Sequence, residues 1–426
     1  MPVISPTILA GGLFVAVYAL IVTERIHRTL AALLGGSLMI ALGVIDQHEA
    51  FSHVDFNVIF LLAGMMIIAN IMARTGVFQW LAVEAVRRAE GRPYRLLVMT
   101  AVITAIASAF LDNVTTVVLL TPITFFIAKR LGASPVPFLV SMVLASNIGG
   151  TATLIGDPPN ILIGSAFDKD FNDFLGRLTP VVVVSLVAYL ILARWLFRAE
   201  LAQVANALEP DDIARLVRDE RRIADIPLMR KSLAVMALVI LGFVLARPLN
   251  LEAATVALLG AVILMIIARE NVHEILKTVE WPTLLFFVGL FILVAGIVKV
   301  GIISAIAQGA IELTGGNVGV TAILVLWMSA VLSAIVDNIP YTATMIPLVQ
   351  ELATVMPIET VIWALVLGAD FGGNATLVGA SANVVVASMA EARGHPIGFG
   401  RFLRYGIPAT LVTMIIATVD VLIRME

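Results

Sequence analysis

The sequence predicts an all-α polytopic membrane protein made of two inverted repeats, each with about five spans, a re-entrant helical hairpin and an unwound transmembrane helix. Hydrophobic residues form 60% of the 426 positions and charged residues only 13%, whereas a soluble domain has roughly 25% charged residues. Apolar runs of about 15–20 residues recur along the chain, long enough for helical spans. The motif Ser-Ala-x-x-Asp-Asn occurs inside such runs at 108–113 and again at 333–338. This offset of 225 residues is about half the chain, so the motif predicts two matching halves.

The first repeat is expected to occupy residues 1–197. Its spans are predicted near 8–22, 29–45, 56–73, 135–163 and 178–197, with the fourth one interrupted. A helical hairpin is predicted at 96–128, and segment 77–88 has the amphipathic pattern of a helix at the membrane interface. The N-terminus lacks the basic region of a signal peptide, so the first apolar run is expected to be a retained span.

The second repeat is expected at 232–426, after a polar cytoplasmic linker at 198–231. Its spans are predicted near 232–246, 252–268, 282–298, 359–390 and 404–423, again with the fourth one interrupted. A second hairpin is predicted at 319–354, and segment 302–313 is the second amphipathic segment.

The similarity between the halves extends beyond the Asp-Asn motif. At the same offset of 225, the matched pairs are Asp55 with Glu280, Gly64 with Gly289, and Gly76 with Gly301. Segment 149–156 matches 372–379 at an offset of 223, and Asn160 then matches Asn383. Matches in this order are not expected from shared apolar composition alone.

The distribution of Lys and Arg predicts the orientation, because these residues are enriched on the cytoplasmic side. With the N-terminus outside, the basic residues fall on the inner side except Lys169, Arg177, Arg247, Lys299 and Arg424. Five spans per half is an odd number, so the second half is inverted. Basic residues flank the first hairpin, whereas residues 301–392 around the second contain none, as expected for hairpins that open to opposite sides. If each hairpin crossed the membrane fully, each half would have six spans and the inversion would disappear.

The two hairpin tips carry the first candidate site residues, Asp112 with Asn113 and Asp337 with Asn338. Ionisable side chains inside a membrane are costly and usually functional. Non-helical backbone at this depth survives when it is buried in protein or lines a wet cavity. We therefore expect Asp112 and Asp337 to bind the coupling ion, which is a proton, a sodium ion, or each in turn. The alternative is that each Asp only caps a half-helix.

The interrupted helices at 146–160 and 370–383 carry the remaining candidates, because their Gly, Pro and polar residues do not suit a regular lipid-facing helix. The substrate- or ion-binding residues expected besides the tips are Thr115, Asn147, Gly150, Thr151, Asp157, Asn160, Asp370, Asn374, Thr376 and Asn383. Between the halves, Asn147 corresponds to Asp370 and Asp157 to Ala380, so the two half-sites are not expected to bind identical species. Close helix packing alone would explain the glycines but not the acids.

Several classes are excluded or disfavoured. The chain has no Cys, its five His lack metal-ligand spacing, and no Walker A motif is present, so no structural metal, cofactor or ATP hydrolysis by this chain is expected. No basic segment resembles a nucleic-acid site. An intramembrane aspartyl protease also needs two buried acids, but Gly368-Ala369-Asp370 lacks the expected G-x-G-D pattern, so the chain is not expected to be an enzyme. A passive channel is disfavoured by titratable acids on hairpins.

The paired Asp-Asn hairpins and the stretch from Gly149 to Asn160 resemble the ion transporter superfamily. The most similar branch holds the arsenite permeases, the NhaD-type sodium/proton antiporters and the melanosomal P protein. The resemblance covers nearly the whole chain. It implies scaffold and transport domains in each half, a homodimer, and elevator-type alternating access, with the substrate between the hairpin tips and the unwound helices.

The resemblance therefore implies a secondary active transporter in a bacterial-type inner (plasma) membrane. We expect arsenite or antimonite efflux coupled to proton antiport. A sodium/proton antiporter is the alternative, with Na⁺ in place of H⁺ at the same acids. A sodium-coupled anion or dicarboxylate symporter is less favoured, because such symporters carry Ser-Asn-Thr at the tips and fixed anions here would repel the substrate. The lipid bilayer is the expected surrounding, and a soluble ATPase partner on the inner loops is left open.

Overall fold

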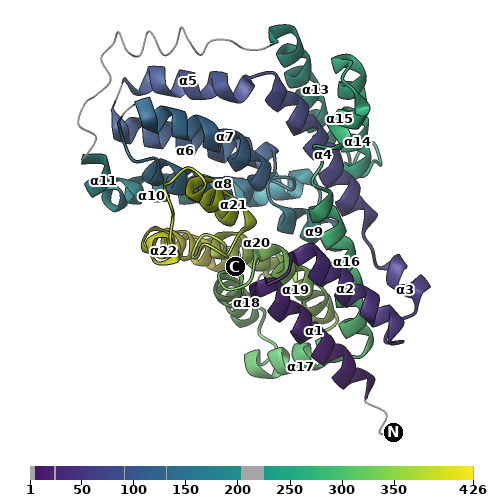
Figure 1. The fold of residues 1–426 in the computed structure, drawn as a ribbon. Helices are drawn as coiled ribbons and strands as arrows, with labels where there is room; N and C mark the ends of the chain where they lie inside the picture. Colours follow the sequence, from purple (N-terminus) through teal and green to yellow (C-terminus); the bar gives the residue numbers. More distant parts are fainter. Residues whose placement is uncertain (1–4, 24, 91, 131, 203–224, 426) are drawn as a thin grey trace.

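The computed structural model describes residues 5–23, 25–90, 92–130, 132–202 and 225–425, and the regular elements in these ranges are all helices (Figure 1). The predicted all-α class is confirmed. Among the described residues, seven helices are long and apolar enough to cross a membrane, or up to eight if the bent pair Ile302–Thr314 and Val318–Ser333 forms one span. A polytopic membrane protein follows from this set of helices.

The first half is a series of long apolar helices and shorter helices, several of which begin after a polar capping residue. Its helices are α1 (Pro6–Thr23), α2 (Arg28–Ala41), α3 (Gln47–Ser52), α4 (Phe56–Arg74), α5 (Val77–Ala89), α6 (Pro93–Phe110), α7 (Asn113–Arg130), α8 (Val136–Gly150), α9 (Pro158–Ala166), α10 (Phe171–Leu196) and α11 (Arg198–Ala202). The side chains of Asp46, Asp55 and Asp170 accept hydrogen bonds from the first backbone N–H groups of α3, α4 and α10, which fixes where these helices begin.

The second half repeats this order helix by helix. Its helices are α13 (Ile226–Val244), α14 (Ala253–Ala268), α15 (Val272–Leu276), α16 (Trp281–Lys299), α17 (Ile302–Thr314), α18 (Val318–Ser333), α19 (Asn338–Leu352), α20 (Glu359–Gly372), α21 (Ser381–Glu391) and α22 (Phe399–Ile423). Helices α1 to α10 thus correspond to α13 to α22. The matched glycines Gly76 and Gly301 both adopt left-handed backbone, with φ of 83° and 77°, at the turn into α5 and α17.

The packing between the halves follows the same pseudo-symmetry. Helix α2 packs on α16, and its counterpart α14 packs on α4. A Cβ added to Gly64 would lie 2.8 Å from the carbonyl carbon of Ala257, and one added to Gly289 would lie 2.5 Å from that of Ala32. The two contacts correspond to each other, because Gly64 and Gly289, and likewise Ala32 and Ala257, are 225 residues apart. The two halves therefore interlock through equivalent close contacts, as the sequence repeat predicts.

The helices form two groups. Helices α1–α4 and α13–α16, here called the scaffold group, pack on one another and lie along the right-hand side of Figure 1. Helices α6–α10 and α18–α22, here called the hairpin group, pack on one another on the other side, with α6 on α8 and α18 on α20. The groups meet mainly where α19 contacts α16 and where α9 contacts α4. The two hairpins and the two interrupted helices all belong to the hairpin group.

The helices extend into the predicted linker at both of the ends that the structure describes. Residues 198–202 form α11, and α13 begins at Ile226 instead of residue 232, while residues 203–224 of the predicted linker lie outside the described residues. Asp225 caps α13 by accepting a hydrogen bond from the N–H of Leu228 at 2.8 Å. Arg230 and Lys231 belong to the first turns of this helix, so their charge placed the start of the second repeat too late.

Candidate functional site

Each hairpin tip is a short break between two helices, and its Asp caps the second one. The chain leaves α6 at Phe110 and enters α7 at Asn113, and it leaves α18 at Ser333 and enters α19 at Asn338. Asp112 Oδ1 accepts a hydrogen bond from the N–H of Thr115 at 2.8 Å. Asp337 Oδ1 accepts one from the N–H of Ile339 at 3.0 Å. The capping role considered for these acids is present in both halves, and it leaves further acceptor capacity on each carboxylate.

The interrupted helices are tied to the hairpins at equivalent points. Helix α8 ends at Gly150 and α9 begins at Pro158, and in the second half α20 ends at Gly372 and α21 begins at Ser381. Threonines in the two breaks bond to the hairpin backbone, Thr153 to the carbonyl of Ala109 and Thr376 to the carbonyl of Ala334 at 2.6 Å. Thr376 therefore holds the break against the hairpin.

The amides of Asn160 and Asn383 satisfy carbonyls that the unwound helices expose. Asn160 Nδ2 donates to the carbonyls of Gly150 at 3.2 Å and Thr153 at 2.8 Å. Asn383 Nδ2 donates to the carbonyl of Gly373 at 2.8 Å. Buried backbone without such partners would be costly inside a membrane protein. The sequence match between these two asparagines reflects an equivalent role in both breaks.

Asp157 joins the two hairpin tips at the centre of the molecule. Its side chain is fully buried, and Oδ2 accepts a hydrogen bond from Asn113 Nδ2 at 2.8 Å. Oδ1 accepts one from Asn338 Nδ2 at 3.3 Å. Asn113 and Asn338 occupy the same position in the two halves, so one carboxylate, which has no acidic counterpart in the second half, is shared between two equivalent amides.

A second asparagine contact joins the two unwound segments. Asn147 Nδ2 donates to Asn374 Oδ1 and to Asn383 Oδ1, each at 3.0 Å. Its Oδ1 accepts a hydrogen bond from Asn113 Nδ2 at 3.3 Å. Together with Asp157 and Asn338, these residues form one buried polar network that the sequence had singled out residue by residue. We call this set, Asn113, Asn147, Asp157, Asn338, Asn374 and Asn383, the central network.

Asp370 lies beside the central network without a hydrogen-bond partner among the described residues. It is fully buried, and neither carboxylate oxygen has a partner; Asn160 Oδ1 is also without one. The side chains of Thr151 and Asn160 lie close enough to interact weakly with the Asp370 carboxylate, without hydrogen bonds of good geometry, and Asp157 and Asp370 repel each other electrostatically. A buried carboxylate that lacks well-formed hydrogen bonds is strongly unfavourable. The site is therefore suited to a bound proton or a small cation.

The roles of two predicted residues are local. The Thr115 backbone, through its N–H, supplies the cap of Asp112. A Cβ added to Gly150 would lie 2.7 Å from the carbonyl oxygen of Gly156, so this position is kept small by close backbone packing. Packing is therefore sufficient to explain Gly150.

Arg28 is a site residue that the sequence did not identify. It is the first residue of α2 in the scaffold group, and its NH1 lies 3.2 Å from Asp337 Oδ2. The same NH1 donates to the hydroxyl of Ser381, which also bonds to Asp337 Oδ2. The guanidinium carbon lies 5.6 Å from the centre of the Phe286 ring. From the sequence, Arg28 was indistinguishable from the other inner-side basic residues, since nothing local links it to the distant tip.

In the part of the chain that the structure describes, the first hairpin tip has no equivalent of this ion pair. At the repeat offsets, Ala253 stands in place of Arg28, Pro158 in place of Ser381, and Leu61 in place of Phe286. Among the described residues Asp112 forms no ion pair, and Glu280 exerts a repulsive electrostatic effect on it. The two tip acids, predicted as equivalent proton-coupling residues, thus have different surroundings.

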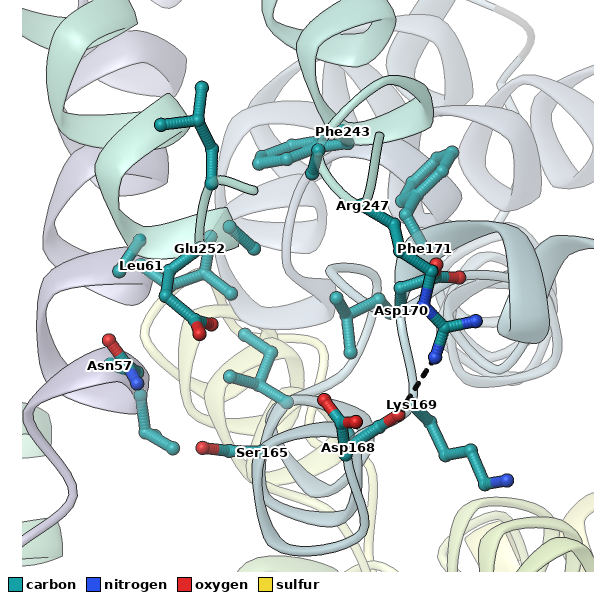
Figure 2. Close-up of a pocket in the computed structure, with 18 of the residues that line it drawn as sticks. Asn57, Leu61, Ser165, Asp168, Lys169, Asp170, Phe171, Phe243, Arg247 and Glu252 are labelled. Atoms are coloured by element: carbon teal, nitrogen blue, oxygen red, sulfur yellow. Dashed lines mark hydrogen bonds and ion pairs between the residues drawn. The ribbon is translucent and has the colours of Figure 1, made fainter. Parts of the chain in front are cut away.

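Two cavities lie between the scaffold and hairpin groups at equivalent positions. We call the first one the inner cavity, because the α1–α2 turn that lines it is predicted to lie on the cytoplasmic side. Its volume is about 430 Å³, and its lining includes Ile21, Val22, Ile26, His27, Arg28, Asp337 and Ser381. The outer cavity, about 340 Å³, is lined at the corresponding positions by Ala246, Arg247, Leu251, Glu252 and Ala253 (Figure 2). The inner cavity reaches the second hairpin tip at Asp337. The lining of the outer cavity contains no residue of the first tip, 108–113, so the described structure opens a tip acid to one side only.

Comparison with known proteins finds that transporters are similar to this chain over most of its length. The family CitMHS, described as "Citrate transporter", matches residues 18–368. An uncharacterized transporter of Mycobacterium tuberculosis is 45% identical over 428 residues, which is 98% of each chain. The P protein of Homo sapiens is 34% identical over 493 residues, covering 96% of this chain and 58% of that protein. The crystal structure of the Alcanivorax borkumensis YdaH transporter, described as having an unusual topology, matches 99% of this chain and 98% of that chain with a TM-score of 0.63 at 15% identity, a likeness of fold.

Proposed function

This chain belongs to the CitMHS citrate transporter family of the ion transporter superfamily, and we propose that it exports a small solute in exchange for protons. The observation that supports this proposal best is the position of Asp157. One buried carboxylate bridges amides from both hairpin tips, and a second, Asp370, lies beside it without a well-formed hydrogen bond to any described residue. Protonation or cation binding at such a pair is coupled to the contacts that hold the tips together. A bacterial-type plasma membrane is the proposed location, in line with the mycobacterial relative.

Alternating access follows from the two cavities. Because they occupy equivalent positions on opposite sides of the pseudo-symmetric molecule, a displacement of the hairpin group against the scaffold group would close one and extend the other. Few polar contacts join the groups near the inner cavity, chiefly that of Arg28 with Asp337 and that of the Tyr18 hydroxyl with the carbonyl of Pro340 at 2.7 Å. A small number of exchangeable contacts is compatible with movement on the timescale of transport.

Arsenite or antimonite is the solute that we propose first, on the resemblance to arsenite permeases. Arsenite is a neutral trihydroxide near neutral pH, and the amide and carboxylate groups of the central network are suited to binding hydroxyl groups. The chain has no Cys, so no thiolate could trap the metalloid, and a hydrogen-bonded site allows its release. The homodimer and a cytoplasmic ATPase partner stay predictions.

Sodium/proton exchange is the second candidate. Within the described part of the chain, Asp370 contributes two buried oxygens without well-formed hydrogen bonds and Asn160 contributes a third, close to the side chain of Thr151. Hard cations prefer such carboxylate and amide oxygens. A cation could therefore occupy this position in place of a proton, and no separate solute would be needed.

Transport by the purified full chain in proteoliposomes tests both candidates. We expect a proton gradient that is acidic inside the vesicles to drive the accumulation of arsenite inside them, measured as total arsenic. Radioactive Na⁺ and citrate are tested in parallel, because the second candidate requires the former and the family description names the latter. Proton-driven movement of Na⁺ alone would establish the antiporter and remove the metalloid assignment. If none of the three solutes moves in response to a proton or sodium gradient, the proposed function is wrong.

A further inference from the structure

The Arg28–Asp337 pair joins the scaffold group to the hairpin group, which would move against it during transport. We propose that Arg28 displaces the coupling cation, a proton or a sodium ion, from Asp337 when the hairpin group faces the inner cavity. This inference rests on the proposed function, since it requires a cation-coupled carrier. It assigns to Arg28 a role in releasing the cation on the cytoplasmic side, which neither the motif nor the resemblance supplies.

The contacts of Asp337 leave little room for a second cation in this conformation. Arg28 NH1 lies 3.2 Å from Oδ2, the hydroxyl of Ser381 also bonds to Oδ2, and the N–H of Ile339 bonds to Oδ1 at 3.0 Å. A guanidinium group keeps its charge at any physiological pH. A proton or sodium ion on Asp337 would therefore have to share the carboxylate with a permanent, well-placed positive charge.

Arg28 is held for this role by the scaffold group. It is the first residue of α2, and its guanidinium carbon lies 5.6 Å from the centre of the Phe286 ring on α16. Asp337 and Ser381 belong to the hairpin group. Displacement of the hairpin group would therefore withdraw Asp337 from Arg28 and leave its carboxylate to take up a cation on the other side of the membrane. Return to the inner side would bring the guanidinium back and expel that cation.

The inner cavity provides the exit. It is about 430 Å³ in volume, and both Arg28 and Asp337 line it, with side-chain exposures of 27% and 14%. The other titratable groups that act on the pair are His27 in the cavity lining, Glu280 through its attraction to Arg28, and Asp157 through its repulsion of Asp337. A cation expelled from Asp337 thus enters the inner cavity and not the buried central network.

The comparison between halves indicates that this arrangement is specific to the second tip. The first tip has Ala253, Pro158 and Leu61 in place of Arg28, Ser381 and Phe286. Leu61 and Glu252 line the outer cavity in Figure 2. Arg247, which lines the same cavity, forms its ion pair with Asp170 at 3.3 Å. Among the described residues, Asp112 therefore has no corresponding positive charge to displace a cation on the outer side, and cation release is favoured on one side of the membrane.

The direct test uses infrared difference spectroscopy of the purified full chain in lipid nanodiscs, after acidification and after addition of Na⁺. In the wild type, Asp337 should give no protonation or sodium-coordination signal in the inward-facing state. Arg28→Gln should produce a new carboxyl signal that disappears in the double variant R28Q/D337N. Arg28→Lys keeps the charge and should keep Asp337 silent. A signal from Asp337 of equal size in the wild type and Arg28→Gln, or no new signal in a folded Arg28→Gln protein, would overturn the proposal.

The same variants have a transport readout. Arg28→Gln should make transport in proteoliposomes at least about tenfold more sensitive to inhibition by acid or Na⁺ on the cytoplasmic side, because the cation is no longer displaced. Arg74→Gln breaks a comparable 3.0 Å ion pair with Glu270 inside the scaffold group and should leave this sensitivity unchanged. If Arg28→Gln does not fold, Ser381→Ala serves instead and should give a smaller shift of about threefold; no shift would count against the proposal.

Failure of this inference can be told apart from failure of the proposed function. If the wild-type protein carries none of the tested solutes, the proposed function fails, and the infrared experiment still decides whether Arg28 excludes cations from Asp337. If the wild type does carry a coupled solute but Arg28→Gln changes neither the infrared signal nor the cytoplasmic sensitivity, the transporter assignment stands and the role of Arg28 is rejected.

Discussion

Asn338 donates a hydrogen bond to Asp157 at 3.3 Å, although the two residues are 181 positions apart and belong to different halves of the chain. Asn113 completes the arrangement from the first half at 2.8 Å. The charge state of one buried carboxylate therefore affects both hairpin tips at once. Under the proposed function, this relationship would couple ion binding at Asp157 to the relative position of the tips without a longer chain of contacts.

Replacing Asp157 by Asn should separate transport from folding. The Asn variant keeps one acceptor but loses the charge, and a hydrogen bond to a charged group contributes about 1.5–3 kcal/mol. We expect coupled transport to fall at least about tenfold, or about 1.4 kcal/mol in the barrier. The melting temperature should change little, because the substitution also removes the electrostatic repulsion between Asp157 and Asp370. Proteoliposome flux and thermal unfolding on the same preparation check this, and normal coupled flux would contradict the central role of Asp157.

Sodium should stabilise the protein through Asp370 if the sodium/proton exchange candidate is correct. A ligand at about 100 times its Kd stabilises the folded state by about 2.7 kcal/mol. We expect the melting temperature to rise with Na⁺ at constant ionic strength, with choline chloride as the matched salt. Asp370→Asn should abolish the rise, since it removes one of the buried oxygens without a partner. An undiminished rise in the variant would locate any sodium site elsewhere.

Glycine positions in the interrupted helices should be sensitive to a single methyl group. A Cβ on Gly149 would overlap the backbone of Ala105, and one on Gly372 would lie 2.5 Å from the Cα of Ala330. We expect Gly149→Ala and Gly372→Ala each to lower stability by about 1–3 kcal/mol, as overpacking does. Gly176→Ala is the control, because nothing lies within 4 Å of its Cβ position and Ala favours the helix by up to about 1 kcal/mol. Thermal unfolding in one detergent ranks the three variants, and equal stabilities would refute the packing account.

The sequence was sufficient for the repeat and for the residue types at the centre, because both depend on local patterns. Apolar runs, the offset of 225 residues and intramembrane polar residues identified the hairpins, both breaks and the members of the central network. Which amide meets which carboxylate depends on contacts between distant segments, so the sharing of Asp157 between Asn113 and Asn338 was not predictable. Arg28 was missed for the same reason, since its partner lies 309 positions away. The linker boundary was placed too late because the charges of Arg230 and Lys231 obscured the start of an apolar helix.

An arginine placed at Ala253 tests whether a scaffold charge can also displace a cation from the first tip acid, Asp112. This residue begins α14 as Arg28 begins α2, at the repeat offset of 225. Ala253→Arg introduces a permanent positive charge at the first half-site, where Asp112 has no ion-pair partner among the described residues. If a scaffold arginine displaces a cation from the tip that approaches it, this variant should weaken activation of transport by external protons or Na⁺ by at least about tenfold. Ala253→Gln has a similar length without the charge and should stay within about twofold of the wild type. Equal behaviour of the Arg and Gln variants would show that side-chain bulk at this position, and not its charge, determines the effect.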